Sequence, residues 1–132
     1  MERNVVLLIL FNKEKKILLQ HRALHMERLP DYWGFFGGGI EKGETPIEAL
    51  RREIKEELRY NVKNPKLLLE QEFKYHDYWG VKYVYVEEHD ENQELKPDEE
   101  SQEMGWFDIE ETGSLKIVDS DLKVLQEIKG KY

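Results

Sequence analysis

Apolar residues are grouped along the chain in short runs that predict β-strands. Residues 5–11 form an unbroken apolar run, and a polar turn at residues 12–16 separates it from a second run at residues 17–21. Unbroken runs of this length are typical of strands buried on both faces. The two runs therefore predict a hairpin. Further strands are expected at residues 33–36, 67–75, 81–87 and 104–107.

One helix is predicted both by its capping residues and by its apolar period. Thr45 and Glu48 form a Thr-x-x-Glu capping box, and Pro46 takes the first helical position, where its missing N–H costs no hydrogen bond. The helix is expected to begin near Thr45 and to run to Arg59. At about 100° per residue it has one apolar face. That face contains Ile47, Leu50, Ile54 and Leu58.

The remaining pattern predicts the architecture. A terminal helix is expected over residues 120–129, with Asp119 or Ser120 as its N-cap. Strands on both sides of a crossing helix, closed by a terminal helix, indicate an α/β sandwich. No repeat or linker divides the 132 residues, and this length is near the usual domain size. A single domain over residues 1–132 is expected.

Three carboxylates lie beside the apolar face of the first helix. Glu53, Glu56 and Glu57 share a stripe about 100° away from it, and like charges on adjacent turns repel. Arg52 can neutralise one of them, but not three. Hard cations such as Mg²⁺ bind through a few carboxylates and keep positions for water and phosphate. A solvated helix face is the alternative interpretation.

A glycine-rich segment precedes this helix. Residues 37–43 read Gly-Gly-Gly-Ile-Glu-Lys-Gly, and they are interpreted as a permissive loop before a helix N-terminus, where N–H groups favour anions. Three glycines are also an ordinary turn. The loop, the capping box and the acidic stripe at fixed offsets together predict a divalent-metal site for a polyphosphate substrate.

Composition limits the partners of such a site. The formal net charge is −8, which disfavours binding a long nucleic-acid backbone, and small phosphates would need metal ions to offset the repulsion. Cysteine is absent, which excludes thiolate metal sites. The apolar run at residues 5–11 is too short to span a membrane, and no leader pattern is seen. A cytoplasmic location without membrane association is the expectation.

Residues 38–60 resemble the signature box of the Nudix hydrolase family, Gly-x5-Glu-x7-Arg-Glu-(aliphatic)-x-Glu-Glu-x-Gly-(aliphatic). The matching residues are Gly38, Glu44, Arg52, Glu53, Ile54, Glu56 and Glu57. The chain departs from the box at Arg59, where the family has glycine, at Tyr60, where it has an aliphatic residue, and at Phe36, where proline is common. Because left-handed backbone is costly for arginine, Asn61 is a candidate for the positive φ. The resemblance implies a mixed-sheet α/β/α sandwich over roughly residues 3–130.

The resemblance also implies roles for individual residues. It predicts Mg²⁺, with Mn²⁺ as an alternative, held by the carboxylates of the stripe (Glu53, Glu56 and Glu57) and by the Gly37 carbonyl. Arg52 is expected to pair with a glutamate and orient it. Glu44 is expected either to cap helix N–H groups or to support the metal shell. A further ligand often comes from a late loop, where Glu100 is the first candidate and Glu103 the second, against a solvated loop. The general base is left open among these carboxylates.

Aromatic, basic and glycine residues are the candidates for substrate recognition. Trp33 and Tyr78 are the main candidates for stacking on a base, whereas Phe35 is more readily a core residue. Arg22 is a candidate for phosphate, and Gly38 and Gly39 for close approach of the substrate. The expected function is a nucleoside triphosphate pyrophosphohydrolase of MutT type that acts on a small nucleotide. Nucleotide sugars, dinucleoside polyphosphates and a non-catalytic nucleotide-binding domain are the alternatives, and a homodimer is left open.

Overall fold

The computed structural model describes residues 1–26, 29–75, 77–98, 101–129 and 131. In chain order the elements are β1 (Val5–Phe11), β2 (Ile17–Arg22), β3 (Trp33–Gly34), β4 (Phe36–Gly39), α1 (Pro46–Leu58), β5 (Lys66–Tyr75), β6 (Tyr78–Glu88), β7 (Ser101–Phe107), the 3₁₀ helix η1 (Ile109–Ser114) and α2 (Asp119–Ile128). No helix among the described residues has the length and apolar character needed to cross a bilayer.

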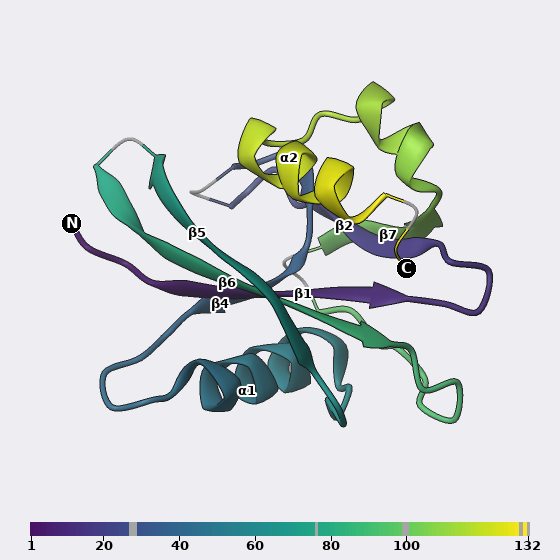
Figure 1. Ribbon diagram of the computed structural model, residues 1–132, viewed down its shortest axis with the longest axis horizontal. Helices are drawn as coiled ribbons and strands as arrows, with labels where there is room; N and C mark the ends of the chain where they lie inside the picture. Colours follow the sequence, from purple (N-terminus) through teal and green to yellow (C-terminus); the bar gives the residue numbers. More distant parts are fainter. Residues whose placement is uncertain (27–28, 76, 99–100, 130, 132) are drawn as a thin grey trace.

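The sheet is mixed, and β1 lies at its centre. The strand order is β3-β2-β1-β6-β5, with β1 parallel to β6 and antiparallel to β2. The first half of β1, Val5 to Leu8, pairs antiparallel with β4. Figure 1 shows α1 on one side of this sheet and α2 with η1 on the other. The predicted α/β/α sandwich with a mixed sheet is therefore confirmed.

Two apolar cores form because side chains of a strand point alternately to opposite faces. On β1, Val6, Leu8 and Leu10 pack toward α1, whereas Ile9 packs toward α2. This explains why the run at residues 5–11 is unbroken. From α1, the core receives Leu50, Ile54 and Leu58, each fully buried. Burial of each such side chain stabilises the fold by about 1.5–3 kcal/mol.

The start of α1 follows the predicted capping box. The Glu48 N–H donates to Thr45 Oγ1 at 3.2 Å, and the Thr45 N–H donates to Glu48 Oε1 at 2.8 Å. The predicted exit of the helix is wrong, because Arg59 itself takes the left-handed conformation, with φ 55°. This conformation costs about 1–2 kcal/mol for a non-glycine residue. The turn places the next residue, Tyr60, fully inside the core, which offsets the cost.

Several predicted boundaries also change. Residues 33–36 form parts of two strands, and the segment taken as a glycine loop contributes Gly37, Gly38 and Gly39 to β4. These glycines form a strand because β1 supplies their hydrogen-bond partners, and the glycine-rich sequence alone does not predict that pairing. The strand predicted at residues 104–107 begins earlier, at Ser101, because β7 pairs with β2 as far as Arg22. The 3₁₀ helix η1 was not predicted. The N-cap of α2 is Val118, and neither proposed polar cap is used.

Candidate active site

Three glycines of β4, Gly37, Gly38 and Gly39, line the site and are called the glycine strand below. A Cβ on Gly37 would lie 1.9 Å from the Val6 carbonyl oxygen of β1, and its φ of +148° also favours glycine. A Cβ on Gly38 would lie 2.5 Å from the carboxyl carbon of Glu53. Both positions need glycine for close approach. The missing side chains allow the backbone of β4 to touch β1 and a carboxylate of α1.

The three predicted metal-binding glutamates of α1 differ in exposure. Glu57 is 3% exposed, and its Oε1 accepts the Gly37 N–H at 2.9 Å. Glu53 is half-buried, and Glu56 is exposed. The sequence placed all three on one acidic stripe, and the structure turns Glu57 of that stripe toward β4. The hydrogen bond from Gly37 replaces the hydration that Glu57 loses on burial.

Arg52 connects the start of the box to its carboxylates. Its Nε and Nη2 donate to the two oxygens of Glu44, each at 2.8 Å, and its Nη1 donates to Glu53 Oε1 at 2.8 Å. A further bond reaches the Gly39 carbonyl at 3.0 Å. Hydrogen bonding to Arg52 lowers the pKa of Glu44 to about 2, and hydrogen bonding to Glu44 raises the pKa of Arg52. The predicted contact of Arg52 with glutamate is present.

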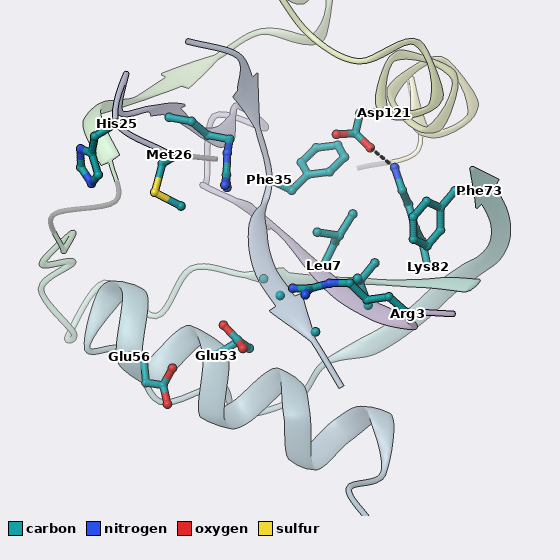
Figure 2. Close-up of a pocket in the computed structure, with 15 residues that line it drawn as sticks. Arg3, Leu7, His25, Met26, Phe35, Glu53, Glu56, Phe73, Lys82 and Asp121 are labelled. Atoms are coloured by element: carbon teal, nitrogen blue, oxygen red, sulfur yellow. Dashed lines mark hydrogen bonds and ion pairs between the residues drawn. The ribbon is translucent and has the colours of Figure 1, made fainter. Parts of the chain in front are cut away.

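A cavity of about 560 Å³ opens beside the glycine strand. Figure 2 shows Glu53 and Glu56 entering from α1 at one end and Phe35, Phe73, Lys82 and Asp121 at the other. The two ends differ in chemistry. One end carries carboxylates suited to a metal ion, and the other combines aromatic rings with a polar pair.

The polar pair at the far end is almost buried. Lys82 Nζ lies 3.1 Å from Asp121 Oδ1, with the two side chains 12% and 10% exposed. Burial raises the pKa of Asp121, and the neighbouring Lys82 opposes that rise. The Lys82 ammonium also donates to Ser120 Oγ at 2.8 Å and lies 5.4 Å from the Phe73 ring centroid. A lysine within an apolar strand was the only sequence signal for this pair.

The structure brings some predicted substrate residues to the cavity and not others. Arg22, Gly38 and Gly39 line it, as does Phe35, which is also a core residue. Trp33 is not among the lining residues. Its ring stacks on His21 at 4.8 Å and meets the edge of Phe107 at 5.1 Å.

Two further predicted positions lie elsewhere, and a third is outside the described residues. Tyr78 pairs with Tyr75 at the end of the β5–β6 hairpin and does not line the cavity among the described residues. Glu103 lies on β7, where its carboxylate is 3.4 Å from His21 Nδ1. Glu100 lies outside the described residues. Arg3, Phe73 and Asp121, which do line the cavity, were not predicted.

The oxygen donors at the acidic end suit a hard divalent cation. Within the described ranges, no three His, Cys, Asp or Glu side chains already surround one point. Mg²⁺ needs only one or two carboxylates, because water and substrate phosphate complete its coordination. Glu53 and Glu56 face the cavity and could supply these, with the Gly37 carbonyl as a backbone oxygen. The donor set therefore fits Mg²⁺.

Comparison with known proteins identifies the family. Residues 1–128 match the NUDIX domain. The chain belongs to the NUDIX family.

Two curated relatives illustrate the level of similarity. An uncharacterized Nudix hydrolase of Listeria innocua is 35% identical over 82 residues, which is 58% of this chain and 48% of the relative. A nucleoside triphosphatase NudI of an Enterobacter species is 66% identical over 29 residues, 22% of this chain and 21% of the relative. The chain spans about half the length, or less, of these relatives.

Solved structures share the whole fold. The MutT protein of Methanosarcina mazei Go1 superposes with a TM-score of 0.88 over 98% of this chain and 94% of its own, at 17% identity. At this identity the comparison shows the fold.

Proposed function

We propose that this chain is a Mg²⁺-dependent pyrophosphohydrolase that converts a nucleoside triphosphate to the monophosphate and pyrophosphate. The observation that carries the proposal is that one cavity joins two kinds of surface. Glu53 and Glu56 lie at one end, and the aromatic and polar residues near Asp121 lie at the other. A nucleoside triphosphate has the same two parts, a polyphosphate and a base.

The acidic end supplies the chemistry of hydrolysis. When bound there, Mg²⁺ would offset phosphate charge and lower the pKa of an attacking water. Glu53 and Glu56 would hold the ion, and the Arg52 bond to Glu53 Oε1 keeps one carboxylate in place. A carboxylate of this set would accept the proton of the water. The bond between Glu57 and the Gly37 N–H fixes the strand against the helix.

The far end would receive the nucleoside. Phe35 and Phe73 offer apolar ring surface, which suits the face of a base. Lys82 has donors and Asp121 has acceptor oxygens, so the pair can read a base edge that carries both an acceptor and a donor. These residues replace Trp33 and Tyr78 in the proposal, because neither lines the cavity.

The test is a substrate panel with Mg²⁺ and product analysis. It contains the canonical and oxidised nucleoside triphosphates, nucleotide sugars, dinucleoside polyphosphates and a 5′-triphosphorylated oligonucleotide. Nucleoside triphosphates should be the best substrates, with pyrophosphate released. Glu56→Gln should lower turnover by about 10²-fold or more, because a metal ligand is lost.

A charge-matched control separates this effect from a general change in charge. Glu127 is exposed on α2, on the opposite side of the sheet from α1. Glu127→Gln should leave turnover unchanged. Wild-type turnover in excess chelator would refute the metal mechanism, and preference for a sugar nucleotide or a dinucleotide would refute the substrate class.

A further inference from the structure

Arg3 is a cavity residue whose backbone is fixed on two sides. Its N–H donates to the Trp79 carbonyl at 2.8 Å. The carbonyl of the next residue, Asn4, accepts the Ile40 N–H at 2.9 Å, and the Asn4 side chain accepts the Val81 N–H at 3.0 Å. The segment before β1 is therefore held between the end of β4 and the start of β6. This fixes the point from which the Arg3 side chain leaves.

The guanidinium of Arg3 lies against the glycine strand. A Cβ on Gly39 would be 3.0 Å from Arg3 Nη2 and 3.1 Å from Cζ. The absence of a side chain at Gly39 thus makes room for the arginine. Arg3 lines the cavity, and Figure 2 shows its guanidinium beside β4.

Arg3 has hydrogen-bonding capacity that the described residues do not use. Its Nε is buried without a hydrogen-bond partner, and none of the ion pairs found among the described residues includes Arg3. Arg52 differs, because its donors are occupied by two glutamates and the Gly39 carbonyl. A buried donor without an acceptor destabilises the free protein, and an anion beside the guanidinium would offset that cost.

The position of Arg3 relative to the carboxylates indicates which part of a ligand it meets. Side chains alternate across a strand, so Cβ directions at neighbouring residues point to opposite faces. A Cβ on Gly38 would point toward Glu53, whereas a Cβ on Gly39 would point toward Arg3. Arg3 therefore lies on the other side of β4 from Glu53. Leu7 and Phe35, which line the cavity, pack in the core on the α2 side of the sheet, where the proposed nucleoside end lies. Val5 also lines the cavity and shares that side, because it is two residues from Leu7 on β1.

We propose that Arg3 binds the α-phosphate, the phosphate attached to the nucleoside, through the Nη donors of its guanidinium. Arginine presents donors in a planar fork that matches two phosphate oxygens. The proposal rests on the proposed function, since it places the nucleoside at the far end of the cavity and the remaining phosphates at Glu53. It assigns a substrate-binding role to a residue outside the signature box.

The test measures binding of the product rather than turnover. Titration calorimetry without metal is run with AMP, GMP, CMP and UMP and with the matching nucleosides, on wild type, Arg3→Gln and Arg3→Lys. Arg3→Gln should weaken binding of the best monophosphate by about 10- to 100-fold, because a charged hydrogen bond is lost. Binding of the nucleoside should stay the same. The affinity of Arg3→Lys for the monophosphate should lie between those of wild type and Arg3→Gln, because lysine keeps the charge but lacks the planar fork of donors.

Lys13→Gln is the control, because Lys13 is exposed in the turn between β1 and β2 and the change removes the same charge. Its monophosphate binding should equal that of wild type. Circular dichroism and Tm verify folding of each variant. The proposal is overturned if Arg3→Gln binds the best monophosphate as wild type does, if it loses nucleoside binding equally, or if wild type binds none of the four monophosphates.

Steady-state kinetics separate this proposal from the proposed function. If wild type hydrolyses a nucleoside triphosphate, Arg3→Gln should raise KM by a factor similar to the loss of monophosphate binding. An unchanged KM would refute the role of Arg3 and would leave the proposed function standing. If wild type hydrolyses no triphosphate but Arg3→Gln still weakens monophosphate binding, the proposed reaction fails and the phosphate contact stands.

Discussion

Substitution of Gly38 by alanine tests whether the glycine strand positions the carboxylate of Glu53. The new Cβ would lie 2.5 Å from both the carboxyl carbon and Oε2 of Glu53. Ordinary contact requires about 3.5 Å, so the carboxylate must move by about 1 Å. A displacement of this size at a reacting centre can lower the rate by about 10²-fold. We expect kcat with Mg²⁺ to fall by that factor.

The cost to stability should be small, because the atoms that must move are the end of a flexible side chain. We expect Gly38→Ala to lower the free energy of unfolding by about 1 kcal/mol, near the low end for overpacking. The neighbouring substitution gives the contrast. A Cβ at Gly37 would lie 1.9 Å from the Val6 backbone oxygen, and the φ of Gly37 is strained for alanine. Gly37→Ala should therefore lower the free energy of unfolding by about 3 kcal/mol or more. Gly113→Ala, with nothing within 4 Å, is the neutral control.

A double-mutant cycle decides whether Glu53 is the cause. In the Glu53→Ala background the clash partner is gone, so Gly38→Ala should no longer change the urea midpoint. Positioning of Glu53 by Gly38 is refuted if Gly38→Ala costs the same stability in both backgrounds, or if the single variant keeps kcat within about threefold of wild type.

Three further predictions follow from the charges of the site. Millimolar Mg²⁺ should raise Tm by ligand linkage, and the metal response should vanish in the variant that carries glutamine at all three stripe positions; an unchanged response would place the metal elsewhere. The pKa of Glu44 is lowered to about 2 by Arg52, so their pairing stabilises the fold above the ordinary pKa of 4.5 and is lost as the pH falls toward 2. Glu44→Gln should therefore lower Tm at pH 7, and its difference from wild type should shrink over that pH range; a constant difference would contradict the pairing. Lys82→Met leaves Asp121 buried without its cation, so the fold should lose about 3–5 kcal/mol at neutral pH. Because burial raises the pKa of Asp121, the loss should become smaller as acid protonates it, and denaturant titrations at pH 7 and pH 5 test this.

The sequence by itself determined the elements whose signals are local. The capping box at Thr45 and the apolar stripe of α1 were predicted correctly, because contacts three and four residues apart are set by helix geometry alone. The same geometry grouped the carboxylates on one stripe, and the contact of Arg52 with glutamate was expected from the resemblance to the Nudix box. The α/β sandwich also followed, since the runs that fill two cores are long enough to mark buried strands, whereas the mixed sheet was implied by the resemblance to the Nudix box.

Only the tertiary structure decided how distant segments meet at the site. Gly37, Gly38 and Gly39 are a strand because β1 supplies their hydrogen-bond partners, and nothing within the glycine sequence specifies that pairing. Arg3 and Asp121 reach one cavity from near opposite ends of the chain, although neither has a local pattern that marks it. Trp33 turns to His21 and Phe107 because β3 pairs with β2. Side-chain direction in a helix follows from its own backbone, whereas the residues that share a cavity depend on which strands pair.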